Sequence, residues 1–249
     1  MQPDNPRWVA NSPFMVAVSG HRDLDAADLP RLREAVTSFV RQLKELLPYT
    51  DLRLAVGMAQ GADLLVAETG VELGVTVEAL LPMPLEHYAA DFDPETLAHL
   101  RTLLQHPHVR CVVLSGPVAL QAAAPHTPAQ RDAMYANLTD TLVRRSSLLL
   151  ALWDGQVSHL PGGTADTVLR YLGIRTEAHA GPATLEFVET THETDLDERL
   201  VYWTPTARSG STSLPTLEPC FLLGTGDSAL HVHRSLPPPL RYHLAELNA

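Results

Sequence analysis

Three short stretches of the chain combine glycine with polar side chains directly after an apolar run. They are Ser19-Gly20-His21-Arg22, the turn from Gly57 to Asp63, and Pro161-Gly162-Gly163-Thr164-Ala165-Asp166. Glycine lets peptide N–H groups approach a ligand without a Cβ in the way, and the start of a helix carries about half a positive charge. Backbone of this kind binds phosphate. The three stretches together therefore indicate a phosphate or nucleotide pocket.

The candidate ligand-binding residues lie at or just after these strand ends, or carry an aromatic ring that could stack on a base. They are Ser19, Gly20, His21, Arg22, Gly57, Ala59, Gly61, Ala62, Asp63, Tyr88, Trp153, Asp154, Gly162, Gly163, Thr164 and Asp166. Asp154 and Asp166 are also the candidates for acid or base chemistry, should the chain be an enzyme.

Several of these residues have a second interpretation. Arg22 could pair with a phosphate or with a neighbouring aspartate, Asp23 or Asp25. Asp63 and Asp166 fall in first turns of helices, where a carboxylate either caps the helix or binds a ribose hydroxyl. The rings of Tyr88 and Trp153 could stack on a base or pack in the core or the pocket wall.

The elements that would position these residues alternate between short apolar runs and amphipathic stretches. The apolar runs predict strands at 14–20, 52–57, 75–82, 108–116, 146–155 and 199–205, and the amphipathic stretches predict helices at 29–47, 64–74, 94–105, 128–145 and 164–172. This alternation predicts an α/β fold with a doubly wound, mostly parallel, Rossmann-like sheet and helices on both faces. In such sheets ligands bind beyond the carboxyl ends of the strands, where the strand order reverses.

The composition changes after residue 205. We expect a nucleotide-binding domain over 12–205, and over 206–249 an extension with a loop, a possible hairpin and a proline-rich segment. The proline triplet that ends at Pro239 leads into a short helical pattern of Leu240, Leu244 and Leu247. We expect an effector or membrane segment to follow residue 239. The alternative is that these leucines fold back and complete the domain.

The bulk composition limits the partners. The chain has 29 acidic and 18 basic residues and a net charge of −11, so we expect no nucleic acid as a partner. No apolar run approaches the roughly 20 residues that span a bilayer, and no signal peptide precedes the domain, so we expect a cytoplasmic protein without direct membrane contact. We further expect a homo-oligomer.

We expect no cofactor and no metal. Only two cysteines occur, Cys111 and Cys220, so a disulfide framework is not predicted. His231, His233 and His243 could suggest a metal site, but histidines in a tail with no Cys or carboxylate cluster nearby are more typical of a surface.

Two motifs resemble those of a known superfamily. "AVGMAQGADLLVAETGVELG" (55–74) and "LPGGTADTV" (160–168) resemble the two glycine signatures of the SLOG superfamily. This superfamily includes the LOG phosphoribohydrolases, the DprA proteins that load single-stranded DNA, the N-terminal domains of TRPM channels and sensor domains of bacterial antiphage systems. The resemblance covers residues 12–205, and it implies a nucleotide-binding Rossmannoid domain.

One departure from the LOG pattern bears on activity. LOG enzymes carry Pro-Gly-Gly-x-Gly-Thr-x-x-Glu with a catalytic glutamate at its end, and Leu169 stands at that place here. The resemblance thus favours a sensor or binding domain for a nucleotide or nucleotide-derived second messenger, in antiphage or stress signalling. The alternatives are a hydrolase of nucleotide N-glycosidic or phosphoester bonds, or a scaffold with a vestigial pocket.

Overall fold

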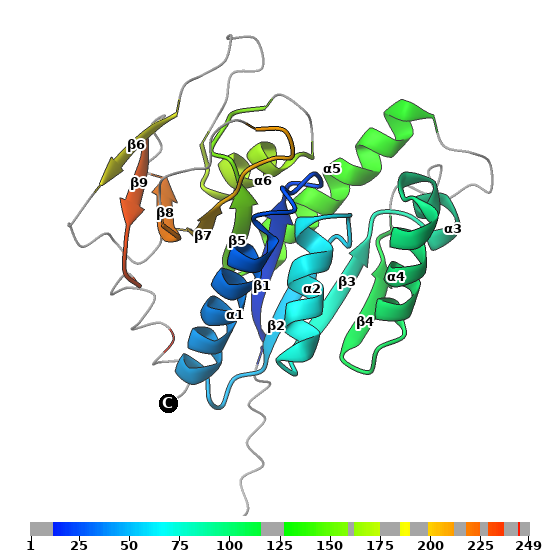
Figure 1. Cartoon of the computed structure of the whole chain (residues 1–249), viewed down its shortest axis with the longest axis horizontal. Helices are drawn as coiled ribbons and strands as arrows, with labels where there is room; N and C mark the ends of the chain where they lie inside the picture. Colours follow the sequence, from blue (N-terminus) through cyan, green and yellow to red (C-terminus); the bar gives the residue numbers. More distant parts are fainter. Residues whose placement is uncertain are drawn as a thin grey trace, which may run out of the picture.

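A single twisted sheet forms the centre of the molecule (Figure 1). The computed structural model describes residues 12–115, 127–158, 162–174, 185–189, 199–211, 218–224, 229–236 and 244. Within them, nine strands pair in the order β4-β3-β2-β1-β5-β7-β8-β9-β6. Among these residues, no helix combines the length and the apolar character that crossing a membrane requires.

The strands and helices alternate along most of the chain. The strands are β1 (Phe14–Gly20), β2 (Leu52–Val56), β3 (Thr76–Leu81), β4 (Val109–Val113), β5 (Leu148–Trp153), β6 (Glu186–Glu189), β7 (Leu200–Pro205), β8 (Cys220–Gly224) and β9 (Ala229–His233). The helices are α1 (Leu29–Leu46), α2 (Ala62–Glu72), α3 (Leu85–Tyr88), α4 (Pro94–Leu104), α5 (Pro128–Arg145) and α6 (Thr164–Tyr171), with a 3-10 turn, η1, at Ala89–Asp91.

The strand order reverses between β1 and β5. From β1 the sheet grows through β2 and β3 to β4 on one side, and on the other side β1 pairs with β5. All pairs from β4 to β7 are parallel. The carboxyl ends of β1 and β5 therefore flank the crevice in which doubly wound sheets bind ligands.

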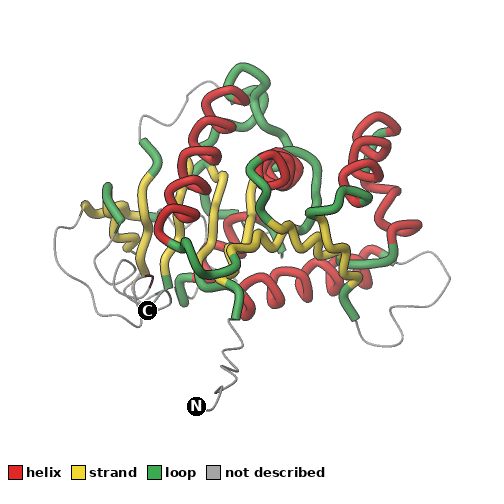
Figure 2. The backbone as a smooth tube through the Cα atoms, turned by 90° about the horizontal axis from the view of Figure 1, so that it is seen from below, coloured by secondary structure: helices red, strands yellow, loops and turns green. Residues whose placement is uncertain are grey.

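Helices cover both faces of the sheet (Figure 2). Leu32 and Phe39 of α1, Leu65 of α2 and Leu100 of α4 pack in one core cluster with Val16 and Leu54 of the strands. Leu142 of α5 and Val168 of α6 pack in the other cluster. Apolar strands covered in this way on both faces confirm the predicted α/β, Rossmann-like class.

Helix starts follow their local sequence. Thr127 and Gln130 form a reciprocal capping box at the start of α5, in which Gln130 N–H donates to Thr127 Oγ1 at 3.3 Å and Thr127 N–H donates to Gln130 Oε1 at 2.8 Å. Asp93 Oδ1 accepts the N–H groups of Glu95 and Thr96 at the start of α4. In contrast, α2 and α6 start at glycines, Gly61 and Gly163, which offer no side-chain cap.

The sheet continues past residue 205. β8 pairs antiparallel with β7 and with β9, and β9 pairs with β6. The stretch 221–233, which the sequence suggested as a possible hairpin in an extension, thus contributes β8 and β9 to the same sheet. The division of the chain at residue 205 stays a prediction. Residues 237–243 and 245–249, including Pro239, Leu240 and Leu247, lie outside the described residues, whereas Leu244 is buried in the main core.

Candidate functional site

A cavity of about 460 Å³ opens at the carboxyl ends of β1, β2 and β5. Thirteen of the sixteen candidate residues line it: Ser19, Gly20, His21, Arg22, Gly57, Ala59, Asp63, Tyr88, Trp153, Asp154, Gly162, Gly163 and Thr164. Its volume lies in the range of small-molecule pockets, about 300–1,000 Å³. Because it lies at the reversal of strand order, the cavity occupies the usual ligand position of this fold class.

The N-terminus of α6 lies at the cavity wall. Gly163 is its N-cap residue, and no side chain caps it among the described residues. Gly162 has φ +73°, and a Cβ there would lie 3.2 Å from Tyr135 Cβ, so both conformation and space favour glycine. Gly162, Gly163, Thr164 and Ala165 all line the cavity. An uncapped helix start of this kind can bind an anion.

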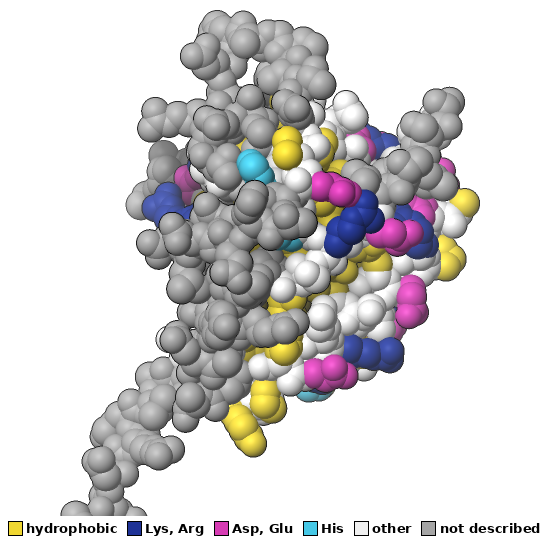
Figure 3. All heavy atoms as spheres, turned by 90° about the vertical axis from the view of Figure 1, so that its left-hand side faces the viewer, with side chains coloured by type: hydrophobic (Ala, Val, Ile, Leu, Met, Phe, Trp, Pro, Cys, Tyr) yellow, Lys and Arg dark blue, Asp and Glu magenta, His cyan; other side chains and the backbone are white. Residues whose placement is uncertain are grey.

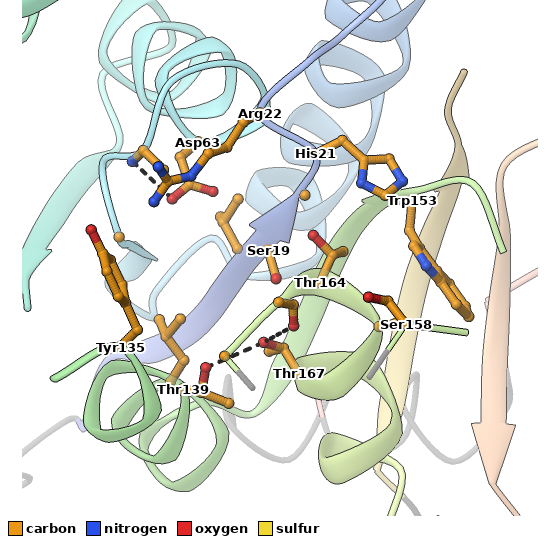
Figure 4. A pocket seen from close by; sticks show the side chains of 18 of the residues that line it. Ser19, His21, Arg22, Asp63, Tyr135, Thr139, Trp153, Ser158, Thr164 and Thr167 are labelled. Carbon is orange, nitrogen blue, oxygen red and sulfur yellow. Dashed lines mark hydrogen bonds between the residues drawn. The ribbon is translucent and has the colours of Figure 1, made fainter. Parts of the chain in front are cut away.

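Hydroxyl side chains gather near this helix start. Ser19, Thr139, Ser158, Thr164 and Thr167 line the cavity from β1, α5, the loop after β5 and α6. In Figure 4, Ser19 lies between two groups of side chains: Thr164 and Thr167 on one side, and Arg22 and Asp63 on the other. Thr167 donates to Gly163 O at 3.0 Å, and its Oγ1 lies 3.4 Å from Thr139 Oγ1. Neutral donors thus complement the helix start.

Arg22 is an exposed guanidinium at the cavity. Its Cζ lies 5.6 Å from the centre of the Tyr135 ring, a cation–π distance. Within the described part of the chain, Arg22 forms no ion pair: its polar contact is with the Tyr135 side chain, and Asp23 pairs instead with Arg208 at 3.0 Å. Tyr135 is held in turn by Asp91, which accepts from its hydroxyl and pairs with Arg131. Arg22 is therefore available to pair with an anionic ligand.

Asp63 presents a buried carboxyl group to the cavity. Its Oδ2 accepts the N–H of Ala59 at 3.1 Å. Burial raises the pKa of Asp63 to about 7, against the lowering effect of that hydrogen bond and of Arg22. Met58, in the same loop, is buried with φ +60°, a conformation that non-glycine residues adopt at a cost of about 1 kcal/mol or more. The loop after β2 thus holds backbone strain beside a carboxyl group poised to titrate near neutrality.

His21 and Asp154 form a pair on another part of the wall. His21 Nε2 lies 3.2 Å from Asp154 Oδ1 and 3.0 Å from the backbone N of Asp154. Burial acts to raise the pKa of Asp154, but the adjacent His21 ring and the hydrogen bond from the Gln156 N–H outweigh it, and the pKa lies below its usual value. Asp154 is therefore ionised at neutral pH, where Asp63 is divided between its protonated and ionised forms.

Three candidate residues do not line the cavity. Asp166 turns back on its own helix, where Oδ2 accepts the Gly162 N–H at 2.8 Å and lies 3.6 Å from Arg170. Ala62 is fully buried in the core. Gly61 lines a second cavity of about 660 Å³ between α1, α2 and α4. Asp166 thus binds the backbone N–H of the residue before Gly163 and does not face the cavity in this structure.

The two candidate aromatic residues belong to the cavity wall. Tyr88 is fully buried, and its hydroxyl donates to Gly57 O at 3.0 Å. Trp153 is also fully buried, and its indole N–H donates to Gln156 O at 3.0 Å. Their rings pack against Phe92 and Trp203 respectively. Both side chains are engaged within the protein, which favours the wall over stacking on a base.

Sequence reasoning missed Tyr135, Thr139 and Arg208. Tyr135 and Thr139 are four residues apart on α5, and Leu142 follows three residues later, so all three share one helix face. That spacing was a usable signal. Arg208 offered none, because it reaches the cavity through a loop after β7 that is held to the loop after β1 by the Arg208–Asp23 pair and by Ser209 N–H donating to Asp23 O at 2.7 Å.

Comparison with known proteins gives matches among solved structures alone. No protein-family profile matches the chain, and no curated protein matches it. DNA processing protein A from Streptococcus pneumoniae aligns at 14% identity and a TM-score of 0.45, over 74% of this chain and 52% of its own. The chain therefore spans about half the length of that protein.

Two further structures are similar to the chain. DNA processing protein A from Helicobacter pylori aligns at 14% identity and a TM-score of 0.41, over 72% of this chain and 66% of its own. TM1055, a structural genomics target, aligns at 16% identity and a TM-score of 0.36, over 64% of this chain and 69% of its own. At these identities the likeness concerns the fold alone.

The exclusion of nucleic acid as a partner is wrong. The H. pylori structure is described as showing a single-stranded DNA binding mode, so a protein of similar fold binds nucleic acid. Net charge sums over the whole chain, whereas phosphate contacts depend on where cations and N–H groups lie. In the view of Figure 3, the described basic and acidic side chains lie next to one another. A net charge of −11 therefore does not exclude a local phosphate site.

Proposed function

We propose that the chain binds a small nucleotide-derived ligand in the cavity at the carboxyl ends of β1, β2 and β5, which we call the main cavity, with a phosphate at the N-terminus of α6. One observation carries the proposal: the uncapped start of α6 lies in the same cavity wall as Ser19 and as Arg22, a cation without a carboxylate partner among the described residues. Helix N–H groups and a guanidinium that no carboxylate pairs with are groups that bind phosphate.

The finer parts of the hypothesis stay predictions. They are that the ligand is a second messenger, that the protein is a cytoplasmic homo-oligomer in antiphage or stress signalling, and that an effector or membrane segment follows residue 239. Leu169 is buried in the core, so the place of the LOG glutamate offers the cavity no carboxylate. This supports binding rather than glycosidic hydrolysis.

Thermal stabilisation by a ligand panel tests the proposal. The panel holds AMP, 3′,5′-cyclic AMP, ADP-ribose, cyclic dinucleotides and a short single-stranded DNA. A ligand at 100 times its dissociation constant adds about 2.7 kcal/mol to the free energy of unfolding. Stabilisation by one or more nucleotides supports the cavity as a nucleotide site. No shift with any of them at millimolar concentration contradicts it.

Arg22→Gln should weaken binding of the ligand that the panel identifies by about tenfold or more, because a hydrogen bond to a charged group contributes about 1.5–3 kcal/mol. Isothermal titration calorimetry measures the change. Arg101→Gln is the matched control, since Arg101 is exposed on α4 outside the cavity and loses the same charge. Equal affinities of the two variants would place the phosphate away from Arg22.

The His21–Asp154 pair supports a second candidate function, hydrolysis of a nucleotide bond. An ionised carboxylate next to an imidazole in a cavity can act as a base or stabilise positive charge. Chromatography of AMP incubated with the protein decides the matter. Release of adenine that is lost in Asp154→Asn supports an enzyme, and unchanged AMP supports the binding function.

A further inference from the structure

Asp63 is a carboxyl group without a cationic partner at hydrogen-bonding distance. It lies in the first turn of α2, is 7% exposed and lines the main cavity. One of its oxygens, Oδ2, accepts the Ala59 N–H. Within the described residues, Asp63 takes part in no ion pair. The other carboxyl oxygen, Oδ1, does not bond to Ala59 and is the one that could bind a ligand.

The groups around Asp63 come from four elements. Arg22, in the loop after β1, attracts the carboxylate. Tyr88, from α3, uses its hydroxyl proton on Gly57 O. Tyr135, from α5, donates its hydroxyl proton to Asp91. Asp91 is the last residue of η1 and also pairs with Arg131. Arg22 is thus the one cation among these groups that is not engaged by a carboxylate.

An anionic ligand in this cavity would meet the charge of an ionised Asp63 in addition to that of Asp154, which lies beside His21 on another part of the wall. Two like charges about 6 Å apart repel by about 3 kcal/mol at an effective dielectric constant of 20. A single unpaired cation, Arg22, cannot neutralise both charges. A proton on Asp63 removes the repulsion and turns an acceptor into a donor. The burial that raises the pKa of Asp63 to about 7 makes this proton available at neutral pH.

We propose that Asp63 takes up one proton from solvent when the cavity binds an anionic ligand, and that its O–H then donates a hydrogen bond to an oxygen of that ligand. Asp63 would thus be a specificity-determining residue that selects a hydrogen-bond acceptor. The Ala59 N–H holds the other carboxyl oxygen in place. This inference rests on the proposed function of the cavity as a nucleotide site.

Proton uptake is measured with a ligand whose own phosphates do not titrate near neutrality. ADP-ribose and 3′,5′-cyclic AMP meet this condition because each of their phosphates lacks the second ionisation of a phosphate monoester, near pH 6. Calorimetry at pH 7.5 in two buffers of different ionisation enthalpy should show net uptake of about half a proton or more. Affinity should fall by up to tenfold per pH unit between pH 7 and 8.5.

Variants of Asp63 distinguish the effect of a hydrogen-bond donor at this position from the effect of removing the negative charge. Asp63→Asn keeps a donor for the ligand and an oxygen for the Ala59 N–H, so it should bind without proton uptake, and more tightly than the parent at pH 8.5. Asp63→Leu lacks the donor and should bind at least tenfold more weakly than Asp63→Asn at every pH. Asp132→Asn, an exposed change of the same charge on α5 outside the cavity, should behave as the parent.

The outcomes are distinct. If ADP-ribose or 3′,5′-cyclic AMP binds without proton uptake, or if uptake persists in Asp63→Asn, the role of Asp63 is overturned while the nucleotide site stands. Equal affinity of Asp63→Asn and Asp63→Leu overturns the donor role. If neither nucleotide binds the folded parent, and no other panel member stabilises it, the proposed function itself fails.

Discussion

At the residue scale, two aspartates of one cavity have opposite environments. Asp154 lies beside the His21 ring and receives a hydrogen bond from the Gln156 N–H, and both keep its pKa low, whereas Asp63 has one backbone donor and is more deeply buried. The sequence placed both residues at strand ends but could not separate them, because the difference depends on burial and on partners distant in the chain. Divergent pKa values in one cavity are typical of functional sites.

Asp63 also links stability to pH. Its pKa rises from 3.8 in the unfolded chain to about 7 in the folded protein. The folded state therefore holds a proton that the unfolded state has lost, and the free energy of unfolding should fall as pH rises from about 4 to 7, by up to about 4 kcal/mol. Asp63→Asn should abolish this part of the pH dependence.

Urea unfolding of both proteins between pH 5 and 8.5 measures the effect. Other groups titrate in this range, so the quantity that matters is the difference between the variant and the parent. We expect Asp63→Asn to gain stability over the parent steadily up to about pH 7 and then to level off. A difference independent of pH would mean that Asp63 is already ionised in the folded protein.

At the scale of elements, periodicity predicted the strands and helices between 14 and 172 because each is long enough to show a pattern. The runs at 14–20 and 148–153 have no charged residue, as buried parallel strands require. β6 was missed because Glu-Phe-Val-Glu is four residues long and mixes apolar and charged types. α3 was missed because a single turn has no period to detect.

The loop after β2 shows why glycine motifs alone could not define the site. Gly61 was predicted to contact ligand, yet it packs against the loop that carries Arg22. Its φ is +84°, and a Cβ would lie 2.4 Å from Arg22 O and 2.6 Å from His21 O. Gly61 thus holds two loops of the cavity together, and the sequence cannot distinguish this role from phosphate contact.

Gly61→Ala should therefore cost more stability than conformation alone explains. Gly74 is the control for a positive φ without close neighbours, since its φ is +69° and no atom lies within 4 Å of a Cβ built there. Gly74→Ala should cost about 1 kcal/mol for the left-handed conformation. Gly61→Ala should cost a further 1–3 kcal/mol, roughly, for overpacking, and should weaken ligand binding by displacing Arg22. Equal losses of thermal stability in the two variants would show that the loops separate freely.

At the scale of the whole molecule, the sheet extends well beyond the predicted domain. β8 and β9 join it after residue 205. The loop from Thr206 to Ser211 is hydrogen-bonded to the loop after β1 through Ser209 N–H and Asp23 O, and to the end of β5 through Thr206 N–H, which donates to Trp153 O at 3.0 Å. Composition suggested an extension here because prolines, serines and threonines are frequent. Cross-strand pairing with β7 depends on tertiary contacts that composition does not encode.

Leu244 extends this argument toward the end of the chain. It is 1% exposed and belongs to the same core cluster as Leu236 and the apolar face of α1. Truncating a buried leucine to alanine costs about 2–5 kcal/mol. Leu244→Ala should therefore lower the melting temperature by at least about 4 °C, at the 2–4 °C per kcal/mol expected for a domain of this size. Leu29→Ala, a change of the same size at a side chain that is 39% exposed, should cost about 0.5 kcal/mol or less. Equal melting temperatures of the two variants would show that the Leu244 side chain contributes nothing to the core.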